Sequence, residues 1–275
     1  MEKPIASTQL YVFSQLAARQ KLPPTERRLP EILEMVRDAG FEAFEGDLGW
    51  FLDADRRKQT LDLMAKMKVG MPSTYVGGCY HSEPEAKLTL EKFEAMADIA
   101  VEVGGKVVVT NPSPNPGRVE KTRDELDTQV KWLARVGKLL QERGIRLAYH
   151  NHDVEMRHNG REFRYTLDRS DPELLGLCAD VHWIYRGGGD PYAYLRTYAK
   201  RVLSLHVRNS VDGVWSEDFG PGDIDYAEIA KILAPAGFHG IAAIEIALDE
   251  ATKITRPFPE DLARSRKYLR EVLGA

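Results

Sequence analysis

The chain has 275 residues, of which 43% are hydrophobic and 29% are charged, a composition typical of a folded globular protein. Its net charge of −4 and the mixing of both signs along the chain argue against a protein that binds the nucleic-acid backbone. There is no apolar run of membrane-spanning length and no signal-peptide core, so we expect a cytoplasmic protein without a membrane partner. Cys79 and Cys178 lie far apart in the chain, which agrees with a reducing compartment.

Short apolar runs and amphipathic segments alternate through the first half of the chain. Leu29, Ile32, Leu33 and Val36 have the spacing of one helix face, and Gly40 is placed to end that helix. The predicted strands are 5–14, 41–44, 68–75 and 106–110, and the predicted helices are 29–39, 54–67 and 88–103.

The same alternation continues through the second half. The predicted strands are 145–150, 174–179, 202–207 and 241–246, and the predicted helices are 124–143, 191–199, 226–236 and 262–273. Two polar segments, 153–170 and 209–225, are predicted to be connections.

Eight strand–helix units in one chain favour a parallel sheet with right-handed crossovers. Their number and the chain length are those of a single (β/α)8 TIM barrel of the α/β class, covering residues 1–275 as one domain. The alternative is a doubly wound open sheet, which usually has fewer strands and often a Gly-x-Gly-x-x-Gly turn; this sequence contains no such turn.

Four residues that commonly bind metals end four consecutive predicted strands. They are His150, Asp180, His206 and Glu245. The C-terminal ends of barrel strands form the active site, so these side chains should converge. Two imidazoles and two carboxylates suit a divalent metal such as Mn²⁺, Zn²⁺, Co²⁺ or Fe²⁺. His152 shares a face with His150 if the strand continues, and either imidazole could be the ligand.

Each of these residues, taken alone, has a structural explanation. A histidine such as His206 in a strand is often a satisfied core residue, and Asp180 or Glu245 could cap a helix or pair with an arginine. Their matching positions on four successive strands favour the metal site.

Other polar or aromatic residues lie at the same predicted rim. Glu45 follows the second strand and Asn111 the fourth, where Asn111 could contact substrate. His182 could contact substrate or pack in the core, and Trp183 could form a stacking wall or a core contact. Arg208 shares a face with His206, and it could bind a substrate oxygen or neutralise a nearby carboxylate.

Several motifs give the chain a family resemblance. They are Tyr-His-Asn-His-Asp at 149–153, Leu-His-Val-Arg-Asn at 205–209, Phe-Gly-Pro-Gly-Asp-Ile-Asp at 219–225 and Ser-Arg-Lys-Tyr-Leu at 265–269. With them the chain resembles the xylose-isomerase-like (β/α)8 superfamily of sugar phosphate isomerases and epimerases, inosose dehydratases and AP-endonuclease-type enzymes. The resemblance implies a divalent metal held by Glu, Asp, His and Glu from strands five to eight.

The chain departs from this pattern at strand five. Asp180, His206 and Glu245 match the last three ligands, whereas His150 stands where many relatives have Glu. In the epimerases of this superfamily the strand-five and strand-eight glutamates are also the acid/base pair. The resemblance therefore keeps Glu245 as a catalytic group and leaves the partner base open, with His152 ahead of Glu45 and Glu155.

The expected activity is metal-dependent isomerisation or epimerisation of a sugar or ketose-like polyol through an enediolate. The alternative is a lyase or dehydratase that acts on a keto-sugar, a keto-cyclitol or a 3-keto-glycoside. Mn²⁺ is the preferred metal, with Zn²⁺, Co²⁺, Mg²⁺ and Fe²⁺ as alternatives. The expected partner is a small carbohydrate; homo-oligomerisation is left open, and no nucleic-acid partner is expected. A barrel that binds sugar without catalysis is a further alternative.

Overall fold

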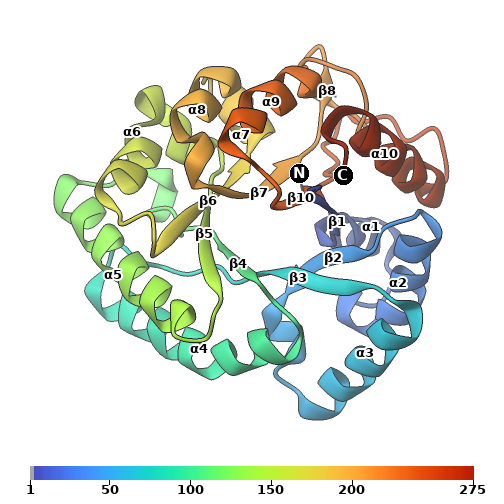
Figure 1. Ribbon diagram of the computed structural model, residues 1–275, viewed down its shortest axis with the longest axis horizontal. Helices are drawn as coiled ribbons and strands as arrows, with labels where there is room; N and C mark the ends of the chain where they lie inside the picture. Colours follow the sequence, from blue (N-terminus) through green and yellow to red (C-terminus); the bar gives the residue numbers. More distant parts are fainter. Residues whose placement is uncertain (1–2) are drawn as a thin grey trace.

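Eight parallel strands close into a barrel in the computed structural model, which describes residues 3–275 (Figure 1). Each strand pairs with its neighbours in the chain, and the ring closes where β1 pairs with β10. The barrel strands are β1 Ile5–Gln9, β2 Ala43–Asp47, β3 Gly70–Tyr75, β4 Val107–Thr110, β5 Arg146–His150, β6 Leu175–Asp180, β7 Val202–Val207 and β10 Ile241–Ile244. The predicted (β/α)8 TIM barrel is confirmed.

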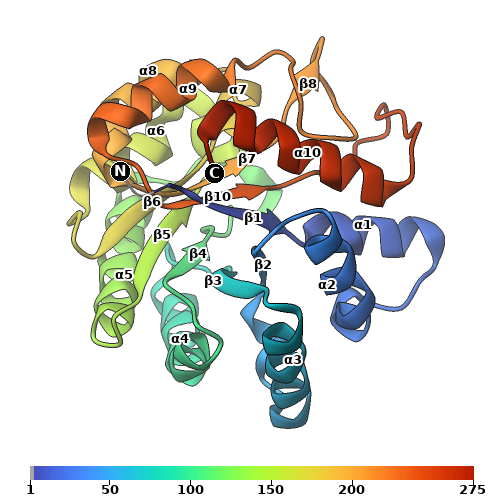
Figure 2. The same ribbon diagram turned by 45° about the vertical axis from the view of Figure 1, so that its right-hand side comes forward.

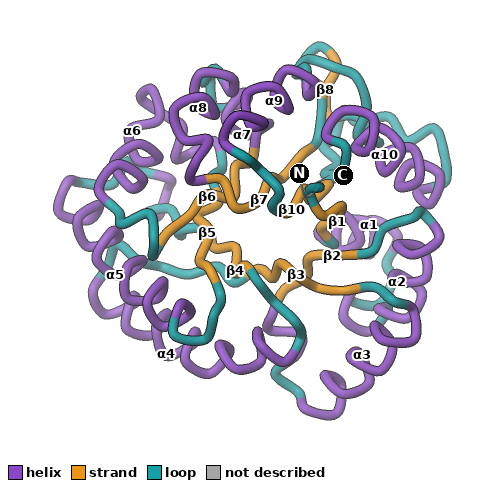
Figure 3. Tube along the Cα trace, in the orientation of Figure 1, coloured by secondary structure: helices purple, strands orange, loops and turns teal. Residues whose placement is uncertain are grey.

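Helices surround this barrel on the outside (Figure 3). They are α1 Tyr11–Gln20, α2 Leu29–Asp38, α3 Ala54–Met67, α4 Glu83–Glu102, α5 Arg123–Gln141, α6 Asp153–Arg169, α7 Val181–Arg186, α8 Pro191–Tyr198, α9 Tyr226–Leu233 and α10 Phe258–Leu273. None of the helices within residues 3–275 is long and apolar enough to cross a membrane.

The core has two parts, as expected of a barrel. The larger part lies between strands and helices and includes Leu33 of α2 and Leu177 of β6. A smaller, separate cluster comes from alternate strand positions: Val107, Val109, Ala148, Cys178, Ile241 and Ala243. Because successive strand residues face opposite sides, Asp180, two residues beyond Cys178 in β6, shares the face of this smaller cluster. Glu245 is two residues beyond Ala243 and directly follows the end of β10.

Two predicted segments differ from the structure in kind. The first strand ends at Gln9, and residues 11–14 begin helix α1, whose buried Val12, Phe13 and Ala17 lie on one side. The polar segment 153–170 is mostly helix α6, with Met156, Phe163 and Leu167 buried. In both cases contact with the barrel decides the conformation, since helices gain most of their stability from a packed face.

A small hairpin interrupts the predicted connection 209–225. It consists of β8 Ser210–Val211 and β9 Val214–Trp215, joined through Asp212 and Gly213. Both turn residues have positive φ (53° and 77°), as a tight hairpin turn requires. In Figure 2 the hairpin lies beside α10.

Candidate active site

The four predicted metal ligands lie together at the C-terminal end of the barrel. His150 ends β5, Asp180 ends β6, His206 is in β7 and Glu245 follows β10. Strand register explains their convergence, because Asp180 pairs with His206, and Glu245 lies two residues beyond Ala243, the partner of His206 in β10. One ligand atom from each of the four lies within 4.8 Å of the others, and all four side chains are buried.

The chemistry of this cluster fits a divalent metal. It offers two imidazole nitrogens and two carboxylate oxygens, a set that Mn²⁺, Zn²⁺ or Fe²⁺ accepts. Nδ1 of His150 is buried and has no hydrogen-bond partner among the described residues. Burial, together with the nearby His206, lowers the pKa of His150 well below its usual value, so the imidazole is neutral and its lone pair is available.

Arg208 lies within the same cluster. Its Nη2 is 2.6 Å from Oδ2 of Asp180, and its Nη1 is 3.4 Å from Oε2 of Glu245. Burial opposes ionisation of Glu245, but Arg208 and His206 outweigh it and hold the pKa of Glu245 well below its usual value. The buried guanidinium therefore keeps Glu245 ionised and shares its own charge between two carboxylates.

Two glutamates contact opposite nitrogens of His206. Nδ1 is 3.1 Å from Oε2 of Glu245, and Nε2 is 2.9 Å from Oε1 of Glu45. The second pair is close but makes no hydrogen bond, and neither atom has another hydrogen-bond partner among the described residues. Glu45 is fully buried and lies outside the cavity wall, behind His206.

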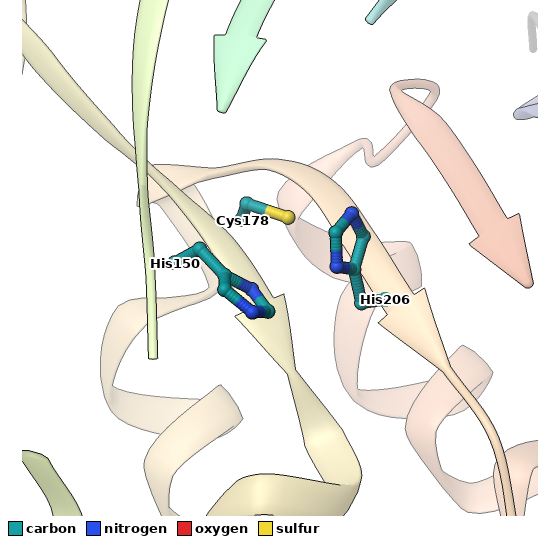
Figure 4. Close-up of side chains that lie close together, drawn as sticks. All are labelled: His150, Cys178 and His206. Atoms are coloured by element: carbon teal, nitrogen blue, oxygen red, sulfur yellow. The ribbon is translucent and has the colours of Figure 1, made fainter. Parts of the chain in front are cut away.

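The cysteine of β6 lies beside both histidines. In Figure 4 the sulfur of Cys178 points toward His206, and the ring of His150 lies below Cys178. Ligand atoms of the three residues lie within 4.8 Å of one another. Cys178 belongs to the inner apolar cluster, and its sulfur lies beside two of the predicted metal ligands.

A cavity of about 350 Å³ opens over three of the four predicted ligands, His150, His206 and Glu245, whereas Asp180 is fully buried outside its wall. It is lined by Gln9, Tyr11, Gln15, Asp47, Tyr75, His150, His152, Trp183, His206, Arg208, Trp215, Glu245 and Ala247. Of the residues predicted for substrate contact or catalysis, His152, Trp183, Arg208 and Glu245 are in this wall.

Two predicted substrate contacts lie outside the cavity wall. Asn111 donates from Nδ2 to the backbone oxygen of His150, at 3.2 Å. His182 is buried, with Nε2 2.8 Å from Oγ of Ser210 and Nδ1 accepting from Nε1 of Trp215 at 3.2 Å. The hydrogen bond of Asn111 holds the end of β5, and those of His182 hold Trp215 in the cavity wall.

His152 and Glu155 lie at the start of α6. The ring of His152 is 4.8 Å from that of His150. The strand does not continue to His152, because β5 ends at His150 and His152 directly precedes α6, so the two imidazoles are neighbours without sharing a strand face. Burial lowers the pKa of His152 to about 4, which leaves it neutral. Glu155 accepts the backbone N–H of His152 at 2.7 Å and is buried away from the cavity.

Several cavity residues are missing from the sequence-based set. Three of them are the last residues of barrel strands: Gln9 in β1, Asp47 in β2 and Tyr75 in β3. The rule that strand ends form the site could therefore have identified them. Gln9 is missed because the predicted first strand continues to residue 14. Trp215 comes from a hairpin within a polar connection, and local sequence gives no signal for its position.

Known proteins share this architecture. The chain is 26% identical over 266 residues to an inosose dehydratase of Geobacillus thermodenitrificans, covering 86% of this chain and 87% of that protein. The structure of a sugar phosphate isomerase/epimerase from Parabacteroides distasonis matches with a TM-score of 0.76 at 19% identity, covering 98% of this chain and 94% of the other. An L-ribulose 3-epimerase structure matches with a TM-score of 0.74 at 16% identity, covering 100% and 95%. A model of the xylose isomerase-like TIM barrel family matches residues 33–272, and the chain belongs to that family.

Proposed function

We propose that the chain is a divalent-metal-dependent isomerase or epimerase that moves the proton next to the carbonyl group of a sugar or polyol ketone. The observation that carries the proposal is the convergence of His150, Asp180, His206 and Glu245 in one buried cluster, three of whose members line the cavity. In this reading the four residues hold the metal, with Mn²⁺ preferred. The proposal includes the cytoplasmic location expected from the sequence.

The bound ion would supply Lewis acidity, stabilising the negative charge that develops on the substrate oxygens as the proton leaves. The protein supplies the groups that move the proton. His152 lines the cavity as a neutral imidazole, and Glu245 lines it as a carboxylate. We assign proton transfer to this pair, because both are proton acceptors in the wall of the cavity.

Two other residues are assigned to orienting the side chains that would hold the metal. Arg208 holds Asp180 and Glu245 by its two terminal nitrogens, which keeps both carboxylates directed toward the cluster. Glu45 faces the far nitrogen of His206 and is assigned to orienting that imidazole, because its carboxylate is outside the cavity wall.

A second candidate is a lyase that removes water from a keto-cyclitol or keto-sugar. The observation that favours it is the 26% identity to an inosose dehydratase along 87% of that protein. The first chemical step is the same in both cases. The reactions differ in whether the proton returns to carbon or a hydroxyl group leaves from the next carbon.

Proton NMR in D₂O distinguishes these outcomes. Purified chain loaded with Mn²⁺ is incubated with ketoses and inososes, quenched with chelator and cleared of metal before spectra are taken. Incorporation of solvent deuterium at one carbon, with no water lost, supports the isomerase or epimerase. A product that has lost water, an enol or the 1,2-diketone to which it tautomerises, supports the lyase. The absence of both deuterium exchange and loss of water with every substrate contradicts both. Asp180→Asn is the control and should show no reaction.

A further inference from the structure

Two tryptophans form one wall of the cavity. Trp183 of α7 and Trp215 of β9 meet edge to face, with ring centroids 5.3 Å apart, and both line the cavity. Indole rings offer a large apolar surface at small entropic cost. The C–H groups on one face of a sugar or cyclitol ring match such a surface, while its hydroxyl groups need polar partners elsewhere.

A chain of hydrogen bonds holds Trp215 in position. Its Nε1 donates to Nδ1 of His182 at 3.2 Å, and Nε2 of His182 is 2.8 Å from Oγ of Ser210. Ser210 in turn donates to Oδ2 of Asp223 at 2.6 Å. One neutral tautomer of His182, protonated on Nε2, satisfies all three bonds. The wall is therefore built into the fold before a ligand arrives.

The charges around the cavity do not favour an anion. The two charges of the proposed ion and those of Arg208 and Arg186 are matched by four carboxylates, those of Asp180, Glu245, Asp47 and Asp249. Arg208, the arginine in the wall, is already shared between Asp180 and Glu245. Asp47 adds a further carboxylate to the wall. Arg186 stacks on Trp215 at 4.5 Å and pairs with Asp249 at 3.5 Å. A phosphate dianion would have to compete with these carboxylates for each guanidinium.

We propose that the cavity selects an uncharged keto-polyol, an unphosphorylated keto-sugar or keto-cyclitol, and that Trp215 determines this specificity by packing on the apolar face of the ring. The inference rests on the proposed function for its carbonyl chemistry. It goes beyond that function by excluding phosphate esters as the preferred substrate class.

Calorimetric titration of the Mn²⁺-loaded chain tests the inference, with fructose, fructose 6-phosphate and an inosose as probes. At least one uncharged probe should bind about tenfold or more tightly than the phosphate ester. Trp215→Ala should weaken that binding by about tenfold, and Trp215→Phe should restore part of it. Trp50→Phe, outside the cavity, is the matched control and should leave binding unchanged.

Three results would overturn the inference. They are equal or tighter binding of fructose 6-phosphate, no binding of either uncharged probe, and an unchanged affinity in Trp215→Ala. Arg186→Gln then shows whether that arginine recruits the phosphate. Deuterium exchange keeps the two proposals apart: an uncharged probe that binds without exchange contradicts the proposed function alone. A phosphate ester that binds more tightly and exchanges contradicts the substrate class alone.

Discussion

His206 has a carboxylate at each of its two ring nitrogens. Glu245 faces its Nδ1 and Glu45 its Nε2, at 3.1 and 2.9 Å, and all three side chains are buried. A ligand histidine commonly has a carboxylate on its second nitrogen, which fixes the ring and raises its basicity. Glu45 lies at that second nitrogen if Nδ1 binds the metal, and it acts on the ring through its charge, since the contact is not a hydrogen bond.

The first prediction concerns Glu45. Glu45→Gln should weaken Mn²⁺ binding by about 10–100-fold, because the negative partner of His206 is lost while the shape is kept. Calorimetric titration of metal-free protein with Mn²⁺ measures the dissociation constant. Glu42→Gln, at an exposed position just before β2, is the control. An unchanged dissociation constant in Glu45→Gln would show that the carboxylate has no such role.

At the scale of the element, α6 links the site to the outer layer. His152 precedes its first turn, and the carboxylate of Glu155 accepts the backbone N–H of His152. Residues 158–160 leave the right-handed helix and adopt positive φ. Burial, with a contribution from Glu162, raises the pKa of Glu155 to about 7. Folding therefore favours the protonated form of this glutamate.

The second prediction follows from this raised pKa. Between the unfolded pKa, about 4.3, and about 7, the folded chain binds more protons at Glu155 than the unfolded chain does. This group's contribution to the free energy of unfolding therefore falls as pH rises through that window. Glu155→Gln should remove this loss. Between pH 5 and pH 8 the free energy of unfolding of the variant should therefore rise by up to about 3 kcal/mol relative to that of wild type.

Urea unfolding of both chains at the two pH values measures this difference. Glu173→Gln, an exposed glutamate before β6, is the control and should follow wild type. Parallel curves for wild type and Glu155→Gln would mean that Glu155 ionises normally in the folded chain.

At the scale of the whole molecule, one barrel supports the site, and its stability comes from the layer between strands and helices. Leu177 of β6 is 1% exposed in that layer, whereas Leu88 of α4 is 64% exposed. We expect Leu177→Ala to lower the free energy of unfolding by about 2–5 kcal/mol. Leu88→Ala should change it by less than about 0.5 kcal/mol. Chemical denaturation checks both, and similar losses would contradict the assigned core.

The barrel could be predicted because its signals repeat along the chain. Apolar runs such as 106–110 and 202–207 are strands by composition, and helical spacing marks 29–39. The residues at the ends of these strands then predicted the cluster of His150, Asp180, His206 and Glu245. Neither the start of α1 nor α6 could be predicted in this way, because Val12 and Phe13 also suit a strand and α6 is largely polar. Their helical state depends on contacts with the barrel.

Contacts between side chains of different strands could not be predicted from the sequence either. Arg208 and Asp180 are 28 residues apart in the chain, and Trp215 reaches the cavity through a hairpin held by Asp223. Such contacts depend on three-dimensional register, which local patterns leave undefined. The sequence therefore predicted which strand-end side chains lie together but not that Glu45 lies behind His206.

The metal site is the central claim, and metal content tests it most directly. Purified wild-type chain, exposed to Mn²⁺ and dialysed, should retain about one ion per chain, as a two-imidazole, two-carboxylate site requires. Asp180→Ala and His206→Ala should each retain almost none, with circular dichroism unchanged because the barrel core remains. Equal metal content in wild type and both variants would contradict the assignment.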